Sequence, residues 1–473
     1  MKKPCRAVFA TLVFAALLSG AADLRSAVPP NIILILSDDV GAETIGAYGG
    51  ESYQTPNIDQ LARDGVRFEY AHAQPLCTPS RVKIMTGQYN FRNYHHFGYL
   101  DPNQATFAHV LKEAGYSTVV AGKWQLYDNR FQDIQGSMPS DAGFDEYLLW
   151  QLTNEQAGSR FWAPLLNHNG KLIQHGPTAY GPDIFNNYVL DYIGEQQSQP
   201  FFIYYPMVLA HDPWVTTPDM QDHSANDQDK FAAMMAYMDK LVGNIRSKIE
   251  QEGLADRTVI LFIGDNGTAR DIVSLQRGTT VRGGKGKTID AGTRVPFIAW
   301  GPGSLLSGLE SNALVNFNDV LPTLADLASI ELPESYPGDG VSLLPILTGQ
   351  QRTLQRDNIF IHYEPRWPTG KPARYAFDRR WKLYEGGGFY DVKTDPLEKN
   401  KLDIKGLAGE GAAAYSQLYS RLQLMPGDLT SNRRWFPAVF YKLLLAAGLG
   451  LVLVFLLIVL LWRHLRRRGS AIC

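Results

Sequence analysis

The chain of 473 residues contains only three cysteines, and their positions leave none of them an evident partner. Cys5 lies in the apolar N-terminal segment and Cys473 is the last residue, so Cys77 is alone in the long middle part of the chain. An internal disulfide is therefore excluded there. A lone cysteine is ordinarily a small buried thiol, but an unpaired one in an exported domain calls for a chemical explanation.

The chain also lacks an excess of basic residues, with 45 lysines and arginines against 47 acidic residues. Seven of the basic residues lie in the export signal and the C-terminal tail described below, which leaves 38 basic and 47 acidic side chains, a net charge of −9. Proteins that bind nucleic acid present a basic surface. We therefore expect no nucleic-acid partner.

Residues 1–22 have the pattern of a cleaved export signal. Lys2, Lys3 and Arg6 give a basic start, an apolar stretch runs from residue 7 to 18, and small residues follow where a signal peptidase cuts. The apolar stretch is shorter than the roughly 20 residues that span a bilayer, which disfavours an uncleaved anchor. Export is expected in either case.

Near the other end, residues 443–462 are apolar and uncharged, and an arginine-rich end follows at once. We predict a linker over residues 426–437, a single transmembrane helix over 438–462 and a cytoplasmic tail over 463–473. A buried core helix is the alternative, but core helices are rarely apolar around their whole circumference. The domain between signal and helix is then expected to be membrane-anchored and periplasmic or extracellular.

Between these ends, short apolar runs alternate with amphipathic segments, which predicts an α/β domain with a mostly parallel sheet. Strands are expected at 31–37, 117–121, 200–205 and 258–263, and helices at 55–65, 106–114 and 231–251. From residue 349 the segments become short, aromatic and basic, which favours antiparallel strands at 358–363 and 380–392. We expect a main domain at 28–348 and a smaller subdomain at 349–425.

Acidic and amide side chains follow two of the expected strands. Asp38 and Asp39 end the first strand, and Asp265 and Asn266 follow the strand at 258–263. Open α/β sheets bind ligands at the carboxyl ends of their strands, and hard oxygen ligands suit Ca²⁺ or Mg²⁺ rather than zinc. Taken singly, each pair could equally be a helix cap or a turn.

The pentapeptide Cys77-Thr-Pro-Ser-Arg81 resembles the Cys-x-Pro-x-Arg signature of type I sulfatases, formylglycine-dependent enzymes of the alkaline phosphatase superfamily. The resemblance extends from residue 31 to about 402, because further segments resemble that family's motifs in the family's order: 31–39, 120–124, 264–266, 283–286, 292–296 and 389–402. It implies an alkaline-phosphatase-like α/β sandwich with a large mixed, mostly parallel central sheet and a smaller C-terminal antiparallel sheet.

The resemblance also implies a chemistry for Cys77. A formylglycine-generating enzyme would oxidise it to an aldehyde. One hydroxyl of the aldehyde hydrate attacks sulfur and releases the alcohol, and the other then restores the aldehyde and expels sulfate. A divalent cation, Ca²⁺ with Mg²⁺ as the alternative, would lower the pKa of the attacking hydroxyl. Its ligands would be Asp38, Asp39, Asp265, Asn266 and the modified Cys77.

By position in the family's motifs, Arg81 would hold the formylglycine and Lys123 and Lys285 would bind sulfate oxygens. His211 would face the leaving oxygen as a general acid. Each of these residues alone could be an ordinary surface or core side chain. Their arrangement around Cys77 and the two acidic pairs favours the catalytic interpretation.

One position departs from the family. Many sulfatases have a histidine after the lysine-tryptophan pair, where it helps to deprotonate the sulfated diol, whereas this chain has Gln125. An amide is no base near neutral pH, although it can hydrogen-bond a hydroxyl or a sulfate oxygen. His72, His95 and His96 are the nearby candidates for another base. Our hypothesis is an active enzyme with a modified proton path.

The sequence thus predicts a membrane-anchored sulfatase, with a sulfated carbohydrate or another sulfated small molecule as substrate. A cluster at His362, Arg366 and Trp367 is a candidate substrate pocket, with subdomain packing as an equal alternative. Two other functions stay open. The first is hydrolysis of phosphate or phosphonate esters by the same fold, and the second is binding of sulfated glycans without turnover, for which Gln125 is the support.

Overall fold

The structure, a computed structural model, describes residues 29–127, 135–150, 152, 158–195, 199–222, 224–366 and 371–426. The expected export signal lies outside these residues, as do the linker beyond residue 426, the transmembrane helix and the cytoplasmic tail. In the described ranges, no helix combines the length and the apolar character that a membrane span requires. The described residues up to Leu422 form one compact unit.

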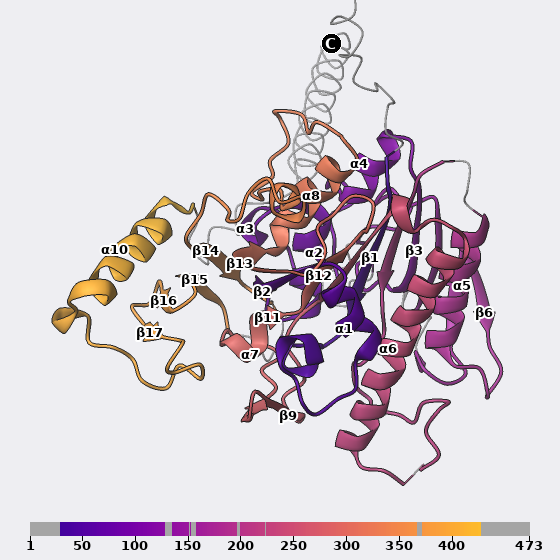
Figure 1. Cartoon of the computed structure of the whole chain (residues 1–473), viewed down its shortest axis with the longest axis horizontal. Helices are drawn as coiled ribbons and strands as arrows, with labels where there is room; N and C mark the ends of the chain where they lie inside the picture. The colour runs from indigo at the N-terminus through magenta and orange to yellow at the C-terminus, as the bar shows by residue number, and fades with distance from the viewer. Residues whose placement is uncertain are drawn as a thin grey trace, which may run out of the picture. The chain divides into compact units, whose positions relative to one another are not determined.

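A mixed sheet with a parallel centre forms the middle of this unit (Figure 1). The central strand β1 (Asn31–Ser37) pairs in parallel with β7 (Phe201–Pro206) on one side and β8 (Thr258–Gly264) on the other. Beyond β7, β3 (Ser117–Lys123) and β4 (Glu146–Trp150) continue the parallel pairing. Each of the predicted strands of the main domain is present, within two residues at either end.

The two sides of the sheet end in antiparallel pairs, so the sheet is mixed as the family resemblance implied, although the sequence analysis did not predict these strands individually. Two of these edge strands, β5 and β6, follow β4. The others lie beyond β8, where β12, β2 and β11 are joined by β13 in parallel with β2. Their bounds are Leu165–His168 for β5, Lys171–Gln174 for β6, Phe297–Trp300 for β12, Val66–His72 for β2, Arg294–Val295 for β11 and Leu309–Asn316 for β13.

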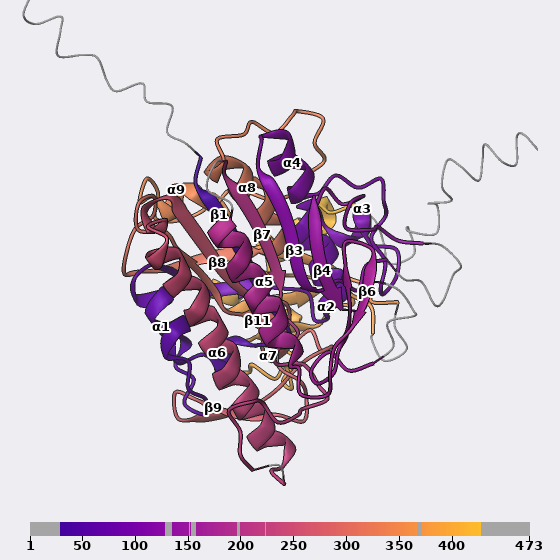
Figure 2. The same cartoon turned by 90° about the vertical axis from the view of Figure 1, so that its right-hand side faces the viewer.

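Helices cover both faces, because alternate residues of β1 point into two separate hydrophobic cores. Ile32 and Leu34 belong to the first core, whereas Ile33 and Ile35 belong to the second. The first core contains α2 (Cys77–Thr86), α4 (Phe107–Glu113) and α8 (Val320–Leu327). The second contains α1 (Pro56–Arg63), α5 (Gly181–Glu195) and α6 (Asp227–Gln251), of which α5 and α6 cross the face seen in Figure 2.

A second, antiparallel sheet follows in the chain, as the sequence predicted. It consists of β14 (Ile359–Tyr363), β15 (Ala373–Phe377), β16 (Trp381–Tyr384) and β17 (Phe389–Asp391), with α10 (Gly409–Leu424) beside it (Figure 1). Its strands pack against Leu76 and Leu314 of the main domain. Since Leu76 precedes Cys77, the small sheet closes one side of the candidate site.

The remaining elements are short helical turns and one hairpin. Their bounds are η1 Ala42–Thr44, η2 Gly46–Tyr48, α3 Asn90–Asn93, η3 Ala255–Arg257, β9 Val273–Gln276, β10 Thr279–Arg282, α7 Asp290–Thr293, η4 Phe317–Asp319, α9 Leu344–Leu347 and η5 Ile404–Gly406.

Candidate active site

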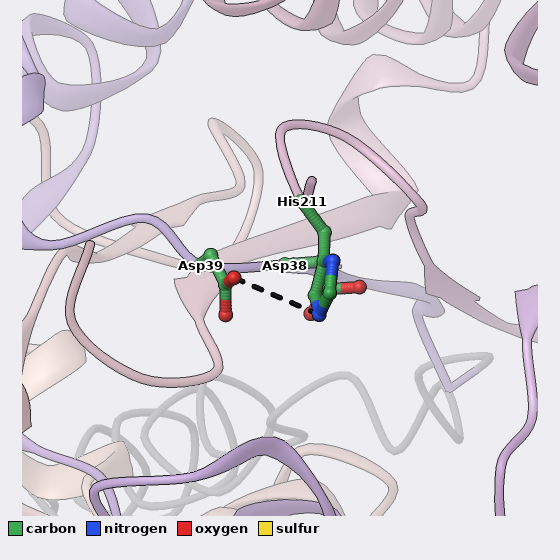
Figure 3. A group of neighbouring side chains, drawn as sticks. All are labelled: Asp38, Asp39 and His211. Carbon is green, nitrogen blue, oxygen red and sulfur yellow. Dashed lines mark ion pairs between the residues drawn. The ribbon is translucent and has the colours of Figure 1, made fainter. Parts of the chain in front are cut away.

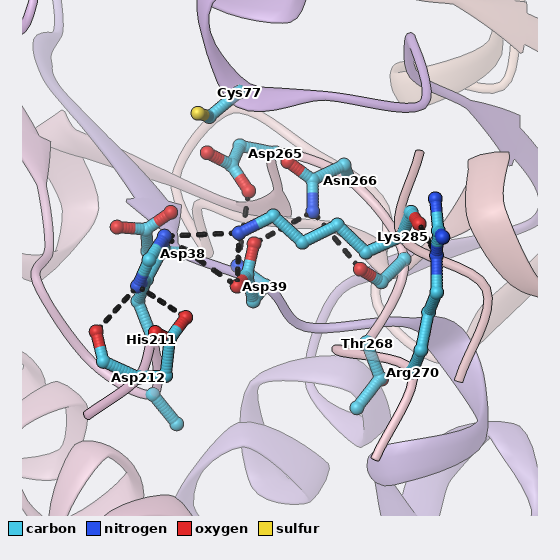
Figure 4. A network of polar contacts seen from close by, with 12 residues as sticks. Asp38, Asp39, Cys77, His211, Asp212, Asp265, Asn266, Thr268, Arg270 and Lys285 are labelled. Carbon is cyan, nitrogen blue, oxygen red and sulfur yellow. Dashed lines mark hydrogen bonds and ion pairs between the residues drawn. The ribbon is translucent and has the colours of Figure 1, made fainter. Parts of the chain in front are cut away.

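The ends of β1 and β8 bring together four of the five predicted metal ligands, Asp38, Asp39, Asp265 and Asn266 (Figure 4). Ser37 and Gly264 are paired in the sheet, so the residues that follow them are neighbours. The backbone N–H of Asp39 donates to Asp265 Oδ1 at 3.0 Å, and Asn266 Nδ2 donates to Asp39 Oδ1 at 2.8 Å. All these side chains are buried. Their grouping follows from two apolar strands that run in parallel and stop at the same edge.

Three buried or half-buried cations surround the carboxylates. Arg81 donates from Nη2 to Asp265 Oδ2 at 3.1 Å and from Nη1 to the carbonyl of Lys123 at 2.9 Å. Lys123 Nζ donates to Asp38 Oδ2 at 2.7 Å. Lys285 Nζ donates to Asp39 Oδ2 at 2.5 Å. The predicted Arg81, Lys123 and Lys285 are thus at the site, each held by a carboxylate.

The neighbouring charges shift the pKa values of Asp38 and Asp265 in opposite directions. Burial would raise the pKa of Asp38, but Lys123, His211 and Arg81 outweigh it and hold that pKa well below its usual value. Burial and the charge of Asp38 raise the pKa of Asp265 to about 7. Of these two carboxyl groups, Asp265 is the one whose ionisation an added positive charge would favour.

His211 lies beside this cluster, on the chain segment after β7 (Figure 3). Its Nε2 is 2.9 Å from Lys285 Nζ and 3.7 Å from Asp39 Oδ2, and its Nδ1 is 3.0 Å from Asp212 Oδ1. Potential ligand atoms of Asp38, Asp39 and His211 lie within 4.8 Å of one another. Sequence analysis placed His211 at the leaving oxygen and did not predict that it lies among the metal ligands.

Two oxygens of the cluster lack the partners that buried acceptors normally have. Asp38 Oδ1 and Asn266 Oδ1 are buried, and neither has a hydrogen-bond donor among the described residues. A divalent cation with a preference for oxygen would satisfy both and would add positive charge beside Asp265. The donor set, mostly carboxylate and amide oxygen, fits Ca²⁺ or Mg²⁺ better than zinc.

Cys77 is the first residue of α2 and is buried beside this cluster (Figure 4). Its Sγ donates to Gln125 Oε1 at 3.3 Å, so the residue that departs from the family motif lies at the expected nucleophile. Burial raises the pKa of the Cys77 thiol, although Lys123 and Lys285 oppose the rise. Gln125 has a φ of 57°, a left-handed conformation that is uncommon for a residue with a side chain.

The other histidines proposed as bases have different neighbours. His72 Nδ1 is 3.3 Å from Thr293 Oγ1, and burial lowers the pKa of His72 to about 3. The His96 ring packs against Tyr99, and burial lowers the pKa of His96 to about 4. None of these contacts involves Cys77. Burial thus keeps His72 and His96 neutral at pH 7.

His95 is the third histidine proposed as a base. Its Nε2 lies 3.9 Å from Asp101 Oδ2, and its ring packs edge-on against Tyr99. Neither contact involves Cys77, so these contacts give no sign that His95 acts on the nucleophile.

His362 and Arg366, two of the three residues proposed to form a substrate pocket, have different contacts. His362 is buried on β14, edge-on to Phe91 and 3.6 Å from Glu364, so it packs between the small sheet and α3. Arg366 donates from Nη1 to the carbonyl of His95 at 2.6 Å. Trp367 lies outside the described residues.

Sequence reasoning missed two residues at the site. Arg160 lies on the segment between β4 and β5, with Nη1 3.9 Å from Asp38 Oδ2. Asp212 accepts a hydrogen bond from His211, which is the largest cause of the lowered pKa of Asp212. The adjacency of His211 and Asp212 could have indicated the second pair. Nothing in the local sequence indicates Arg160, because its position depends on contacts with Trp150 and Asp212 that form only in the folded chain.

Comparison with known proteins agrees with this geometry. The model of the family named Sulfatase matches residues 30–330, and the model for the C-terminal part of N-sulphoglucosamine sulphohydrolase matches residues 285–422. Human arylsulfatase A is 30% identical, over 89% of this chain and 92% of the relative. N-acetylgalactosamine-6-sulfatase of Canis lupus familiaris is 29% identical, over 69% of this chain and 67% of the relative.

Solved structures share the fold. One, from work on glycosaminoglycan metabolism by Bacteroides thetaiotaomicron, has a TM-score of 0.68 and 25% identity over 84% of this chain and 99% of that one. Another, solved in complex with its substrate D-glucosamine-2-N,6-O-disulfate, has a TM-score of 0.68 and 22% identity over 84% of this chain and 97% of that one. With the alkaline-phosphatase-like sheet and a family match over more than half its length, the chain belongs to the sulfatase family of sulfuric ester hydrolases.

Proposed function

We propose that this protein hydrolyses sulfate esters of carbohydrates, with Cys77 as the precursor of a formylglycine and with a divalent cation beside it. The observation that carries the proposal is the position of Cys77. It opens α2 next to Gln125, under the influence of two lysine charges and beside buried oxygen ligands, of which two have no hydrogen-bond donor in the described part of the chain. A purely structural thiol would not require this surrounding charge.

The cation would be held by Asp38, Asp39, Asp265 and Asn266, with Ca²⁺ as the expected ion and Mg²⁺ as the alternative. When bound, it would supply positive charge to a sulfate oxygen and lower the pKa of the attacking hydroxyl. His211 lies close enough to this set to interact with it, at 3.7 Å from Asp39. The modified Cys77 would complete the ligands.

The cationic side chains would bind and orient the ester. Lys123 and Lys285 each donate to a carboxylate of the cluster, and both amines can turn toward the oxygens of an incoming sulfate. Arg81, fully buried between Asp265 and the carbonyl of Lys123, is too constrained to move and would hold the nucleophile in place. These groups would place the sulfur close to the attacking hydroxyl.

His211 would protonate the leaving sugar oxygen. Its Nδ1 is held by Asp212, which orients the ring. Its Nε2 faces Lys285 and Asp39 within the cluster. Protonation by a positioned acid matters most for sugars, because an alcohol is a poor leaving group unless it receives a proton.

A carbohydrate substrate is supported by the relatives and not by the pocket itself. One relative is named for N-acetylgalactosamine-6-sulfate, and the C-terminal family model is named for N-sulphoglucosamine. The rival reaction on phosphorus has a fold-level parallel, a phosphonate monoester hydrolase of Agrobacterium radiobacter with a TM-score of 0.61 and 19% identity. The cysteine pentapeptide favours sulfate.

We also propose that the catalytic domain is exported, periplasmic or extracellular, and tethered by a C-terminal helix. The support is the charge-free run at 443–462 with arginines directly after it. Fractionation of cells that make the full chain and a chain ending at residue 426 tests this. The full chain should sediment with membranes and the shortened chain should be released, whereas release of both would refute the anchor.

Turnover is tested by assaying matched sulfate, phosphate and phosphonate esters with the enzyme made beside a formylglycine-generating enzyme. The proposal expects sulfate release as the main activity and its loss in Cys77→Ala. Preferred phosphate or phosphonate hydrolysis would support the first alternative. Tight binding of sulfated glycans without any release would support the second.

A further inference from the structure

Arg160 is held in a fixed orientation at the edge of the site. Its guanidinium lies 4.3 Å from the ring centre of Trp150, the last residue of β4, and also borders the ring of Phe161. Its Nη2 donates to the carbonyl of Asp212 at 3.1 Å. Arginine stacks well on aromatic faces and keeps its fork of donors available in the ring plane. The side chain is therefore positioned before any ligand arrives.

The other amino group of the Arg160 guanidinium, Nη1, donates no hydrogen bond to any described residue. Nη1 is buried, has no hydrogen-bond partner among the described residues, and lies 3.9 Å from Asp38 Oδ2, which is too far for a hydrogen bond. A buried donor of a charged group is seldom left unpaired in a native protein. Because Trp150 and Asp212 fix the guanidinium, it cannot turn outward to find water.

The charge of the site also favours one more anionic partner. Four cations lie there against four carboxylates, and the proposed divalent ion would add two positive charges: Arg81, Lys123, Arg160 and Lys285 face Asp38, Asp39, Asp212 and Asp265. Arg81, Lys123 and Lys285 each donate a hydrogen bond to a carboxylate, whereas Arg160 does not. Arg160 is thus the cation most available to a substrate.

We propose that Arg160 is a substrate-binding residue whose Nη1 donates to an oxyanion oxygen of the bound ester. The inference rests on the proposed function, because the ester is the substrate named there. The oxyanion is either the sulfate that is cleaved or a second sulfate on the same sugar, since both present the same acceptor oxygens to a guanidinium. Arg160 binds and orients the substrate and takes no part in proton transfer.

Arg160→Met and Arg160→Lys test this, with Arg246→Met as the matched control. Arg246 also lies over a tryptophan, 5.2 Å from the ring centre of Trp300, but pairs with Asp64, the residue after α1, and with Glu250 on α6. The substrates are a monosulfated sugar and the same sugar with a second sulfate. Inorganic sulfate serves as a probe of binding without turnover, read as inhibition and as a shift of the melting temperature.

In Arg160→Met we expect KM to rise at least about tenfold for one or both esters. The KM of Arg160→Lys should lie between those of wild type and Arg160→Met, because lysine keeps the positive charge but lacks the paired N–H donors of the guanidinium. If KM rises equally for both esters and inorganic sulfate binds more weakly, Arg160 holds the cleaved sulfate. If KM rises only for the disulfated sugar and inorganic sulfate binds unchanged, it holds the second group.

The proposal is overturned if KM and sulfate binding are unchanged in Arg160→Met, whether or not kcat falls. A fall in kcat alone would mean that Arg160 only supports the segment that carries His211. An equal loss in Arg246→Met would also overturn it, since the effect would then come from general destabilisation. If wild type cleaves neither ester but Arg160→Met still weakens sulfate binding, the proposed function fails and the binding role stands.

Discussion

The thiol of Cys77 and the amide oxygen of Gln125 are 3.3 Å apart, which places an amide where many sulfatases have a histidine. An amide can hold a hydroxyl in place but cannot accept its proton at neutral pH. If Cys77 is converted to formylglycine as proposed, the proton of the sulfated diol would have to pass to another group.

Substitution of Gln125 tests how effectively another group accepts this proton. In Gln125→His we expect kcat for sulfate release to change by less than tenfold, because the modified proton path of our hypothesis would already support turnover. A missing general base would be worth about 10²- to 10⁴-fold. Steady-state kinetics on one sulfated sugar, with Gln125→Ala as the control for the lost hydrogen bond, decides this. A hundredfold rise in Gln125→His would show that the native proton path is deficient.

The loss of kcat on replacing His211 should depend on the leaving group of the substrate. We expect His211→Ala to lower kcat by about 10²- to 10⁴-fold on a sulfated sugar, which needs a proton on departure. On an aryl sulfate, whose phenolate leaves more readily, the loss should be much smaller. Single-turnover rates on both substrates test this. Equal losses on the two substrates would assign His211 to the cation or to the sulfate instead of the leaving oxygen.

Cation binding should be visible without turnover. Added Ca²⁺ should raise the melting temperature, because a ligand at one hundred times its Kd stabilises the folded state by about 2.7 kcal/mol. Asp38→Asn should abolish this shift. Asp239→Asn is the matched control, since Asp239 is a buried carboxylate that instead accepts the backbone N–H groups of Asn57 and Ile58 at the start of α1.

The control should lower the melting temperature in the absence of Ca²⁺ and keep the Ca²⁺-induced shift. The same series with Mg²⁺ identifies the better ion. A Ca²⁺ shift that survives in Asp38→Asn would place the cation elsewhere.

A buried lysine on α2 should make stability depend on pH. Lys83 is fully buried, with Nζ bonded to Asn316 Oδ1 and 5.4 Å from the ring centre of Tyr89. Burial lowers the pKa of Lys83 from 10.5 to about 7, although Asp319 opposes the shift. Between these two values the unfolded chain binds more protons than the folded one, so the free energy of unfolding should rise with pH from about 7 to 10.

The expected slope is at most about 1.4 kcal/mol per pH unit. Lys83→Met should remove it, which denaturant unfolding at pH 7 and pH 9 would reveal as a smaller difference than in wild type. Lys240→Met is the control, because Lys240 is half-exposed over Tyr237 and paired with Asp219. An unchanged pH difference in Lys83→Met would mean that Lys83 is not the titrating group.

Much of this site could be predicted because its signals are local in sequence. The apolar runs before Asp38 and Asp265 identify two buried strands, and parallel pairing then brings their ends together. The position of Gln125 beside Cys77 also followed from motif order. The antiparallel edges of the sheet could not be predicted in this way, because short edge strands carry little periodicity of their own.

The position of His211 among the ligands and the role of Arg160 depend on tertiary structure. His211 is set by the segment that follows β7, and Arg160 by its packing on Trp150. Neither arrangement has a sequence signature, because the partners lie on different elements that meet only when the sheet has formed. Loops that carry such residues are positioned by the scaffold beneath them.

The central claim is that Cys77 becomes the nucleophile by conversion to formylglycine. The most direct test is the mass of the tryptic peptide Phe68–Arg81 from protein made in its native host or beside a formylglycine-generating enzyme. The account predicts a peptide in which the thiol is replaced by an aldehyde. A peptide that retains an unmodified cysteine under these maturing conditions would contradict it.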